Sequence, residues 1–254
     1  MATNDYESLT SVDKAARIFK QLCREPHEYK ITELASMTGI NRTTLHRILK
    51  KMEEYNLVIK TERNKTYKLG PMAYEMGSFY LHSFKFGDNI FPILDKISHE
   101  SQESVGIAVR EGEQVISLYE IEVDQPLKMN YRAGLVYPMN RGCYGKCLMA
   151  YYDRERVSEL LDQVRFEKVC LNTLTEKAEI LNEYDKIKKQ GYVVSDEETF
   201  RYAVGVGIPI PSPDGSVRSC VAISFLKNEN YEEKVEEFKE MLFKYKDKIA
   251  RFMI

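Results

Sequence analysis

The sequence contains no apolar run that approaches the ~20 residues needed to span a membrane. Its first ten residues, MATNDYESLT, carry neither a basic stretch nor an apolar core, so they do not resemble a secretory signal. The five cysteines are scattered, odd in number and without a CxxC pair, which favours reduced thiols in a cytoplasm. Internal repeats and low-complexity segments are also absent. We therefore expect a cytoplasmic globular protein without a membrane partner.

The sequence also lacks the patterns that enzymes and metal sites need. Gly145 and Lys146 do not belong to a phosphate-binding P-loop, because position 140 is Asn and position 147 is Cys. A zinc site needs four ligands, and the four histidines are far in sequence from Cys143 and Cys147. A redox role for this cysteine pair stays open, since thiols near a helix N-terminus have a lowered pKa. We predict no catalytic residue, no cofactor and no metal.

The charge of the chain is unevenly distributed. The net charge is −2, but residues 1–70 hold 13 Lys and Arg against 9 Asp and Glu, a net charge of +4. Residues 71–254 hold 24 basic and 30 acidic side chains, a net charge of −6. A basic surplus at one end favours a nucleic-acid-binding domain attached to a body with another task.

Residues 31–60 predict two short helices and the start of a strand. The first helix, residues 31–38, has a candidate N-cap at Thr32 and ends at Gly39. The second helix has a candidate N-cap at Asn41. Its apolar stripe consists of Leu45, Ile48, Leu49 and Met52.

The opposite face of the second helix is basic, and no acidic residue occurs from 41 to 52. Two short helices joined by a Gly-containing turn suit insertion of the second helix into a DNA major groove. Arg and Lys attract phosphate, while Arg, His and Thr reach base edges. An ordinary amphipathic helix with a solvated basic face is the alternative. The predicted DNA contacts on this helix are Arg42, Thr43, Thr44, His46, Arg47 and Lys50.

Two flanking segments extend the pattern to a winged helix. A helix that begins at Ser11 and ends before Pro26 supplies the third wall of the core. Its predicted apolar stripe consists of Val12, Ala15, Ala16, Phe19, Leu22 and Cys23. Residues 57–70 alternate with period two and predict a β-hairpin, with a turn in which Asn64 tolerates the left-handed conformation. The basic tip of this wing is predicted to contact DNA through Arg63, Asn64 and Lys65.

A nearly all-apolar segment follows the hairpin. Pro71 suits the first turn of a helix that Gly87 ends, and Asp88 then caps the next helix. A helix without a polar face is buried on several sides, so we expect the same helix of a second subunit to cover it. The predicted domains are a DNA-binding domain at 1–70, a linker and dimerisation helix at 71–87 and a C-terminal domain at 88–254.

The C-terminal domain mixes strands and helices. Alternating residues predict a hairpin that turns at Glu111 and Gly112. Further strands are predicted at 126–134, 192–198, 203–212 and 216–226, and helices at 143–152, 154–164, 175–189 and 231–252. We interpret the acidic run at 195–198 as a strand end with a surface loop rather than a metal or acid–base site. This order predicts an α+β domain built on an antiparallel sheet.

With these motifs in this order, the whole chain resembles the IclR family of bacterial transcription regulators. The N-terminal signature is matched by SVDKAARIF, ITELASMTGINRTTLHRILKKMEEYNLV and YKLG; the body is matched by YPMNRGCYGKCLMAYY, KKQGYVVSDEE and GVGIPIPSPDGSVRSCVAIS. The resemblance implies a winged helix-turn-helix domain, a linker helix and a GAF-like effector domain. It also implies homodimers, often paired into homotetramers, on palindromic double-stranded DNA operators. The implied effector is a small molecule, by family habit an organic or sugar-derived acid.

The effector contacts that the resemblance implies lie beside departures from the family pattern. The usual His-Ala is Asn140-Arg141 here, Cys147 replaces an Ala, and Gly205 stands where many members have Cys. The glycine-rich turn at 142–146 opens a helix whose free N–H groups favour a carboxylate or phosphate, although a close helix–sheet crossing also needs glycine. By resemblance, the effector pocket is lined by Gly142, Cys143, Tyr144, Gly145, Ser195, Ala203, Gly205 and Ser224.

The leading hypothesis is a ligand-responsive, DNA-binding transcriptional regulator that acts as a repressor. The first alternative is a small-molecule-binding enzyme with an accessory DNA-binding-like domain, which requires a catalytic constellation that the sequence lacks. The second is a structural DNA-bridging protein, whose salt-sensitive DNA binding no metabolite would alter.

Overall fold

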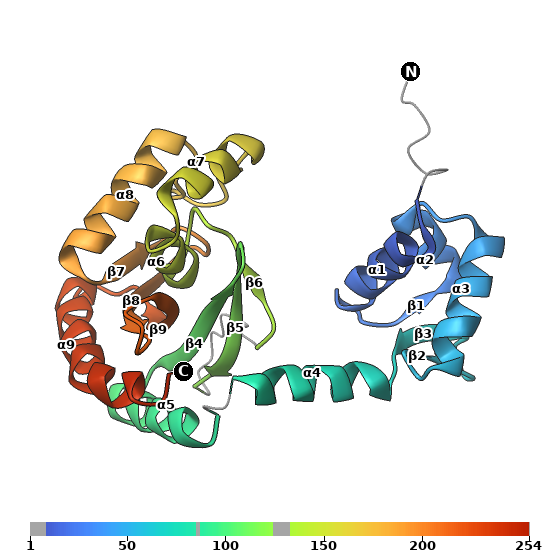
Figure 1. Cartoon of the computed structure of the whole chain (residues 1–254), viewed down its shortest axis with the longest axis horizontal. Coiled ribbons are helices and arrows are strands. Elements are labelled where there is room, and N and C mark those ends of the chain that lie inside the picture. Colours follow the sequence, from blue (N-terminus) through green and yellow to red (C-terminus); the bar gives the residue numbers. More distant parts are fainter. Residues whose placement is uncertain (1–8, 85–86, 124–132, 254) are drawn as a thin grey trace. The chain divides into compact units, whose positions relative to one another are not determined.

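The computed structural model describes residues 9–84, 87–123 and 133–253, and the chain divides into two compact units, residues 1–83 and 84–254. Each unit has hydrophobic core residues of its own. Figure 1 shows the helices and strands that form the two units. Within the described ranges, no helix is long and apolar enough to cross a membrane.

The N-terminal unit is a winged helix built from three helices and a small sheet, followed by a fourth helix. Its elements are α1 (Ser11–Leu22), β1 (Tyr29–Lys30), α2 (Ile31–Thr38), α3 (Arg42–Glu54), β2 (Val58–Thr61), β3 (Thr66–Leu69) and α4 (Pro71–Ser83). The strands pair antiparallel in the order β1-β3-β2. Strand β1 is only two residues long and is not predicted from the sequence.

The core of this unit corrects part of the predicted apolar stripe of α1. Val12 is 78% exposed, whereas Ile18, which the stripe omitted, is fully buried with Leu22. Of the two predicted N-caps in this unit, one is confirmed and one is wrong. Asn41 caps α3 as predicted, but α2 begins at Ile31, so the predicted N-cap at Thr32 is wrong.

The wing and the helix after it also differ from the prediction in detail. The left-handed residue of the wing turn is Lys65, with φ of 51°, rather than Asn64. α4 ends at Ser83, and α5 (Gly87–Ser101) begins at Gly87, so Gly87 opens a helix instead of ending one. The predicted cap at Asp88 is therefore wrong, because this residue already lies inside α5.

The C-terminal unit is built on one six-stranded antiparallel sheet in the order β6-β5-β4-β9-β8-β7. The strands are β4 (Ser104–Glu111), β5 (Gln114–Ile121), β6 (Val136–Tyr137), β7 (Val193–Asp196), β8 (Ala203–Pro211) and β9 (Val217–Leu226). The helices that follow α5 are α6 (Cys143–Ala150), α7 (Arg154–Gln163), α8 (Lys177–Gln190) and α9 (Tyr231–Ala250). The strand predicted at 126–134 falls almost entirely outside the described residues.

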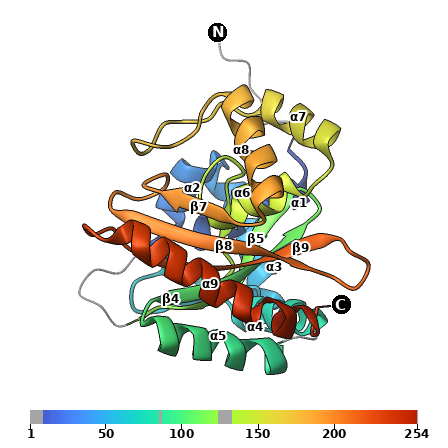
Figure 2. The same cartoon turned by 90° about the vertical axis from the view of Figure 1, so that its left-hand side faces the viewer.

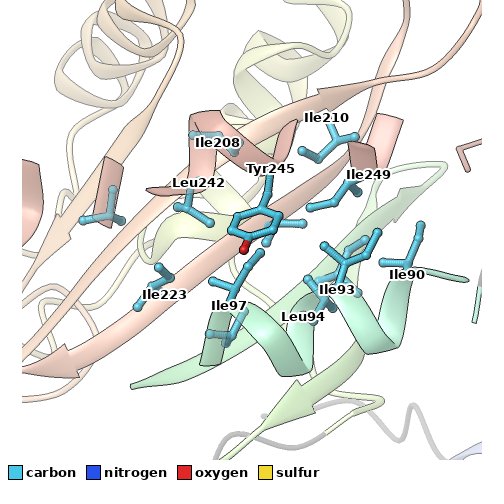
Figure 3. Packing of buried hydrophobic residues seen from close by; sticks show 14 of the residues in the cluster. Ile90, Ile93, Leu94, Ile97, Ile208, Ile210, Ile223, Leu242, Tyr245 and Ile249 are labelled. Atoms are coloured by element: carbon cyan, nitrogen blue, oxygen red, sulfur yellow. The ribbon is translucent and has the colours of Figure 1, made fainter. Parts of the chain in front are cut away.

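Helices cover both faces of this sheet, which makes the unit a three-layer α+β domain (Figures 1 and 2). On one face α5 and α9 pack against the strands through aliphatic side chains, including Leu94, Ile97 and Leu242 (Figure 3). On the other face α6, α7 and α8 build a second core that contains Leu148 and Tyr184. The predicted mixed α+β architecture is confirmed.

Candidate DNA-binding face and effector pocket

The two faces of α3 separate apolar from basic side chains. Leu45, Leu49 and Met52 are buried in the core of the N-terminal unit. The Thr44 backbone N–H donates to Asn41 Oδ1 at 2.9 Å, which fixes the first turn of the helix. The half-buried Thr44 thus lies beside the cap, while the remaining predicted contacts on α3 are exposed: Arg42, Thr43, His46, Arg47 and Lys50.

The tip of the wing adds polar side chains to the surface of the same unit. Arg63, Asn64 and Lys65 are all exposed in the turn between β2 and β3. The turn is held at its base, where Thr61 Oγ1 donates to the Thr66 carbonyl oxygen at 3.1 Å. The N-terminal unit therefore presents a basic helix face and a basic hairpin tip.

In the C-terminal unit, the start of α6 packs closely against the sheet. A side chain at Gly145 would place its Cβ 1.8 Å from the Pro138 carbonyl oxygen, so only glycine fits there. Gly142 has φ of 75°, in the left-handed region that glycine adopts without strain. Its N–H donates to Glu198 Oε2 at 2.9 Å. This amide is thus occupied by an internal carboxyl, whereas the sequence analysis expected it to be free for a ligand.

A cavity lies between the start of α6 and the sheet. The volume of this cavity is about 40 Å³. The structure brings seven of the eight predicted effector contacts around it, namely Gly142, Cys143, Tyr144, Ser195, Ala203, Gly205 and Ser224. Gly145 is not among the lining residues, because it faces the Pro138 backbone instead.

Six further residues complete the cavity and are not predicted from the sequence: Glu120, Tyr137, Thr199, Phe200, Val204 and Ala222. Glu120 on β5 has two tyrosine partners. Tyr137 Oη donates to its Oε1 and Tyr144 Oη to its Oε2, each at 3.2 Å. The Ser117 side chain also donates to this carboxyl. Surrounding protein atoms nevertheless raise the pKa of Glu120 to about 7, because they disfavour the charged form more than the hydrogen bonds favour it.

A β-bulge turns Glu120 toward the cavity. Tyr119 pairs with Ile107 and Ser117 pairs with Ala108, so Leu118 is an extra residue in β5. Before the bulge, the odd-numbered residues of β5 face α6. After the bulge, the odd-numbered residues pack on the α5 side, so the even-numbered Glu120 faces α6. Bulges often re-aim a side chain beside a functional site.

A buried ionic network lies behind the start of α6. The Lys146 side chain is 1% exposed and its Nζ donates to Glu198 Oε1 at 2.5 Å, Glu183 Oε1 at 2.9 Å and the Val194 carbonyl oxygen at 2.8 Å. Burial alone would lower the pKa of Lys146, but the two carboxylates outweigh it and raise the pKa. Glu198 is buried, so the interpretation of 195–198 as a surface loop is wrong for this residue.

The cysteine pair on α6 does not fit a redox switch. Cys143 and Cys147 are both buried, and burial raises the pKa of the Cys143 thiol well above its usual range. A thiol that holds its proton is a poor nucleophile. In the described residues, no group of three or more His, Cys, Asp or Glu side chains could hold a metal ion.

Comparison with known proteins identifies similar domains in both units. Residues 11–61 match the family model described as the IclR helix-turn-helix domain, and residues 78–251 match that of the C-terminal region of the bacterial transcriptional regulator IclR. The transcriptional regulator KdgR of Dickeya chrysanthemi is 26% identical over 236 residues, which cover 93% of this chain and 77% of that protein. The transcriptional repressor IclR of Escherichia coli is 26% identical over 199 residues, 78% of this chain and 72% of that one.

Solved structures share the fold over nearly the full chain. The IclR protein of Thermotoga maritima has a TM-score of 0.73 and 26% identity, and the match covers 95% of this chain and 97% of that one. An IclR homologue of Microbacterium hydrocarbonoxydans, solved with 4-hydroxybenzoate, has a TM-score of 0.82 at 17% identity over 96% of this chain and 98% of that one. The domains and relatives are transcriptional regulators, and nothing in them supports the enzyme alternative.

Proposed function

Because this chain belongs to the IclR family of bacterial transcriptional regulators, we propose that it is a repressor whose α3 and wing read an operator and whose sheet cavity holds the effector. The exposed basic face of α3 is the observation that carries the DNA-binding half. Arg42, His46 and Arg47 are all exposed while Leu45 and Leu49 anchor the helix in the core. The helix therefore offers donors to base edges and phosphates without loss of packing.

The role of α4 is proposed from its exposed apolar side chains. None of its residues is buried, and Tyr74 and Phe79 are 83% and 69% exposed. An exposed apolar stripe of this kind marks an interaction surface. We infer that α4 of a second copy covers it, so that two recognition helices reach half-sites about 34 Å apart on a palindromic operator.

The cavity is proposed as the effector site because it combines enclosure with convergent polar groups. Ser195, Ser224 and Thr199 supply hydroxyls, and Glu120 supplies a carboxyl. A small pocket with a few converging polar groups is the usual form of a ligand site. Effector binding there would change operator affinity by a coupling of about 1–3 kcal/mol.

The DNA-binding proposal is tested with an operator selected from a random DNA pool by the wild-type protein. Arg47→Ala should weaken its binding roughly tenfold or more, the effect of losing one good base contact. Lys20→Ala is the matched control, because Lys20 is an exposed basic residue of α1. Gel-shift titrations of the three proteins measure the effect. Equal affinity in wild type and Arg47→Ala would contradict the proposed reading helix.

A further inference from the structure

The charged side chains that line the cavity at the start of α6 restrict the ligands that it can bind. Within the described part of the chain, its lining contains one acid, Glu120, and no Lys, Arg or His. The ammonium of Lys146, which is buried behind the start of α6, is engaged by Glu198 and Glu183. The lining therefore has no cation to neutralise a ligand carboxylate placed beside Glu120.

The carboxyl of Glu120 is held in one orientation but is not saturated. Its two oxygens offer about four lone-pair positions. The side chains of Ser117, Tyr137 and Tyr144 donate to it. The rings of the two tyrosines meet edge to face with centroids 4.9 Å apart, which fixes their hydroxyls. An acceptor position is therefore left for a donor that enters the cavity.

The backbone beside Glu120 is shaped to leave room for this carboxyl. A Cβ at Gly106 would lie 1.9 Å from Glu120 Oε2 and 2.4 Å from Tyr144 Oη. Gly106 pairs directly with Glu120 across β4 and β5. Since the glycine has no side chain, the carboxyl and the tyrosine hydroxyl occupy the space above the neighbouring strand.

We propose that Glu120 selects the effector by accepting a hydrogen bond from a ligand hydroxyl, so that the pocket takes a small hydroxylated compound. This inference rests on the proposed function of the cavity as the effector site. The compound is small because the cavity volume is only about 40 Å³.

Other chemistries fit this end of the cavity poorly. A ligand carboxylate at Glu120 would face a second acid without a cation between them, which disfavours the ionised pair. An ammonium carries three N–H donors that all need acceptors when buried. It would also lie near the positive end of the α6 dipole. A hydroxyl needs only one acceptor and can accept in turn from the hydroxyls of Thr199 and Ser224, which line the cavity.

The experiment titrates the full-length protein with four three-carbon compounds: glycerol, glycerate, propionate and malonate. Binding is followed by NMR of ¹³C-methyl alanine, because the methyl groups of Ala203 and Ala222 line the cavity. Glycerol or glycerate should bind at least roughly tenfold more tightly than propionate, as expected for one hydrogen bond to a carboxyl. Malonate, which brings a second carboxylate, should bind no better than propionate.

Variants connect this preference to the carboxyl. Glu120→Ala should remove the preference for hydroxylated compounds, and Glu120→Gln, which keeps an acceptor and nearly the same shape, should retain part of it. Glu111→Gln is the matched control, because Glu111 is exposed at the end of β4. If Glu120→Ala fails to fold, the Glu120→Gln titration still decides the question through the ranking of malonate, which should improve.

The outcomes are separable from those of the proposed function. Equal binding of propionate and the hydroxylated compounds, an unchanged preference in both Glu120 variants, or no response of Ala203 and Ala222 to any of the four compounds overturns hydroxyl selection. The ranking of glycerol against glycerate assigns the other end of the ligand to a polyol or a hydroxy acid, and either ranking supports the selection. A compound that fills the cavity with the expected preference but leaves operator affinity unchanged contradicts the effector role alone.

Discussion

The C-terminal unit contains two buried carboxyls, those of Glu198 and Glu120, which differ in the groups that donate hydrogen bonds to them. In the region behind α6, Glu198 meets the ammonium of Lys146 at 2.5 Å and accepts from the Gly142 N–H at 2.9 Å. In the region on β5, the donors to Glu120 among the described residues are hydroxyls, including those of Tyr137 and Tyr144 at 3.2 Å. Both carboxyls lie on the α6 side of one sheet, so the difference lies in their partners.

The difference in partners distinguishes the carboxyl of Glu198, which is bound within the protein, from that of Glu120, which can still accept a hydrogen bond from a ligand. Lys146 and Glu198 neutralise one another and tie the start of α6 to the segment after β7, so a ligand that displaced either would leave a buried charge. Among the described residues no cation pairs with Glu120, which lines the cavity. Its raised pKa, about 7, keeps it poised between a neutral and a charged form. The ion pair therefore has a structural role, whereas Glu120 is the group that we propose to contact a ligand.

The largest effect is expected from breaking the first region. Lys146→Met should lower the free energy of unfolding by about 3–5 kcal/mol, because Glu198 is left buried without its cation. Urea denaturation at pH 7 measures the loss. Adding Glu198→Gln to the same chain should recover part of it, since the more deeply buried of the two carboxylates is then neutral.

A surface ion pair provides the control for this prediction. Lys177 pairs with Asp162 at 2.6 Å, but these side chains are 35% and 63% exposed. Lys177→Met should therefore cost less than about 1 kcal/mol. A comparable loss in the two single variants would show that burial does not distinguish the pair at Lys146.

The second prediction concerns the pH dependence of the other region. The pKa of Glu120 rises from 4.5 to about 7 on folding, and each pKa unit is worth about 1.4 kcal/mol. The folded state therefore binds the proton more tightly than the unfolded state, and the cost of this carboxyl appears as the pH rises from about 4.5 to about 7. Glu120→Gln should stabilise the protein by at most about 3 kcal/mol at pH 8 relative to the wild type, with the gain absent at pH 4.

Unfolding curves at several pH values measure this difference. The opposite trend, a variant that gains stability relative to wild type as the pH falls, would mean that Glu120 is held in its charged form. The Glu111→Gln control should show no such window, since Glu111 is exposed.

The DNA-binding unit could be predicted from the sequence because its signals are local. The spacing of Leu45, Leu49 and Met52 defines the buried face of α3, and the exposed face follows from it. Errors occur where a choice depends on packing. Val12 and Ile18 are both apolar residues of α1, and only the tertiary structure determines which of them is buried.

The two acidic regions could not be predicted in the same way. Lys146 and Glu198 are 52 residues apart, and α6 is buried all round, so no amphipathic pattern indicates what its lysine faces. Glu120 lies in a strand whose alternation would send it to the α5 side. The extra residue at Leu118 reverses that alternation, and a shift of one residue moves every later side chain to the other face. The bulge has no sequence signal comparable with a glycine turn.

The smallest expected effect comes from trimming one hydroxyl donor. Tyr137→Phe removes the hydrogen bond to Glu120 Oε1, which should cost about 1 kcal/mol of unfolding free energy at pH 8. Because this bond favours the charged carboxyl, its loss should cost less at pH 5 and should raise the pKa of Glu120 further. Tyr184→Phe is the matched control, since Tyr184 donates to the Met139 carbonyl oxygen at 2.7 Å, an acceptor that does not titrate. Its cost should be the same at both pH values, and a pH-independent cost in Tyr137→Phe as well would remove Glu120 from the titrating groups of the cavity.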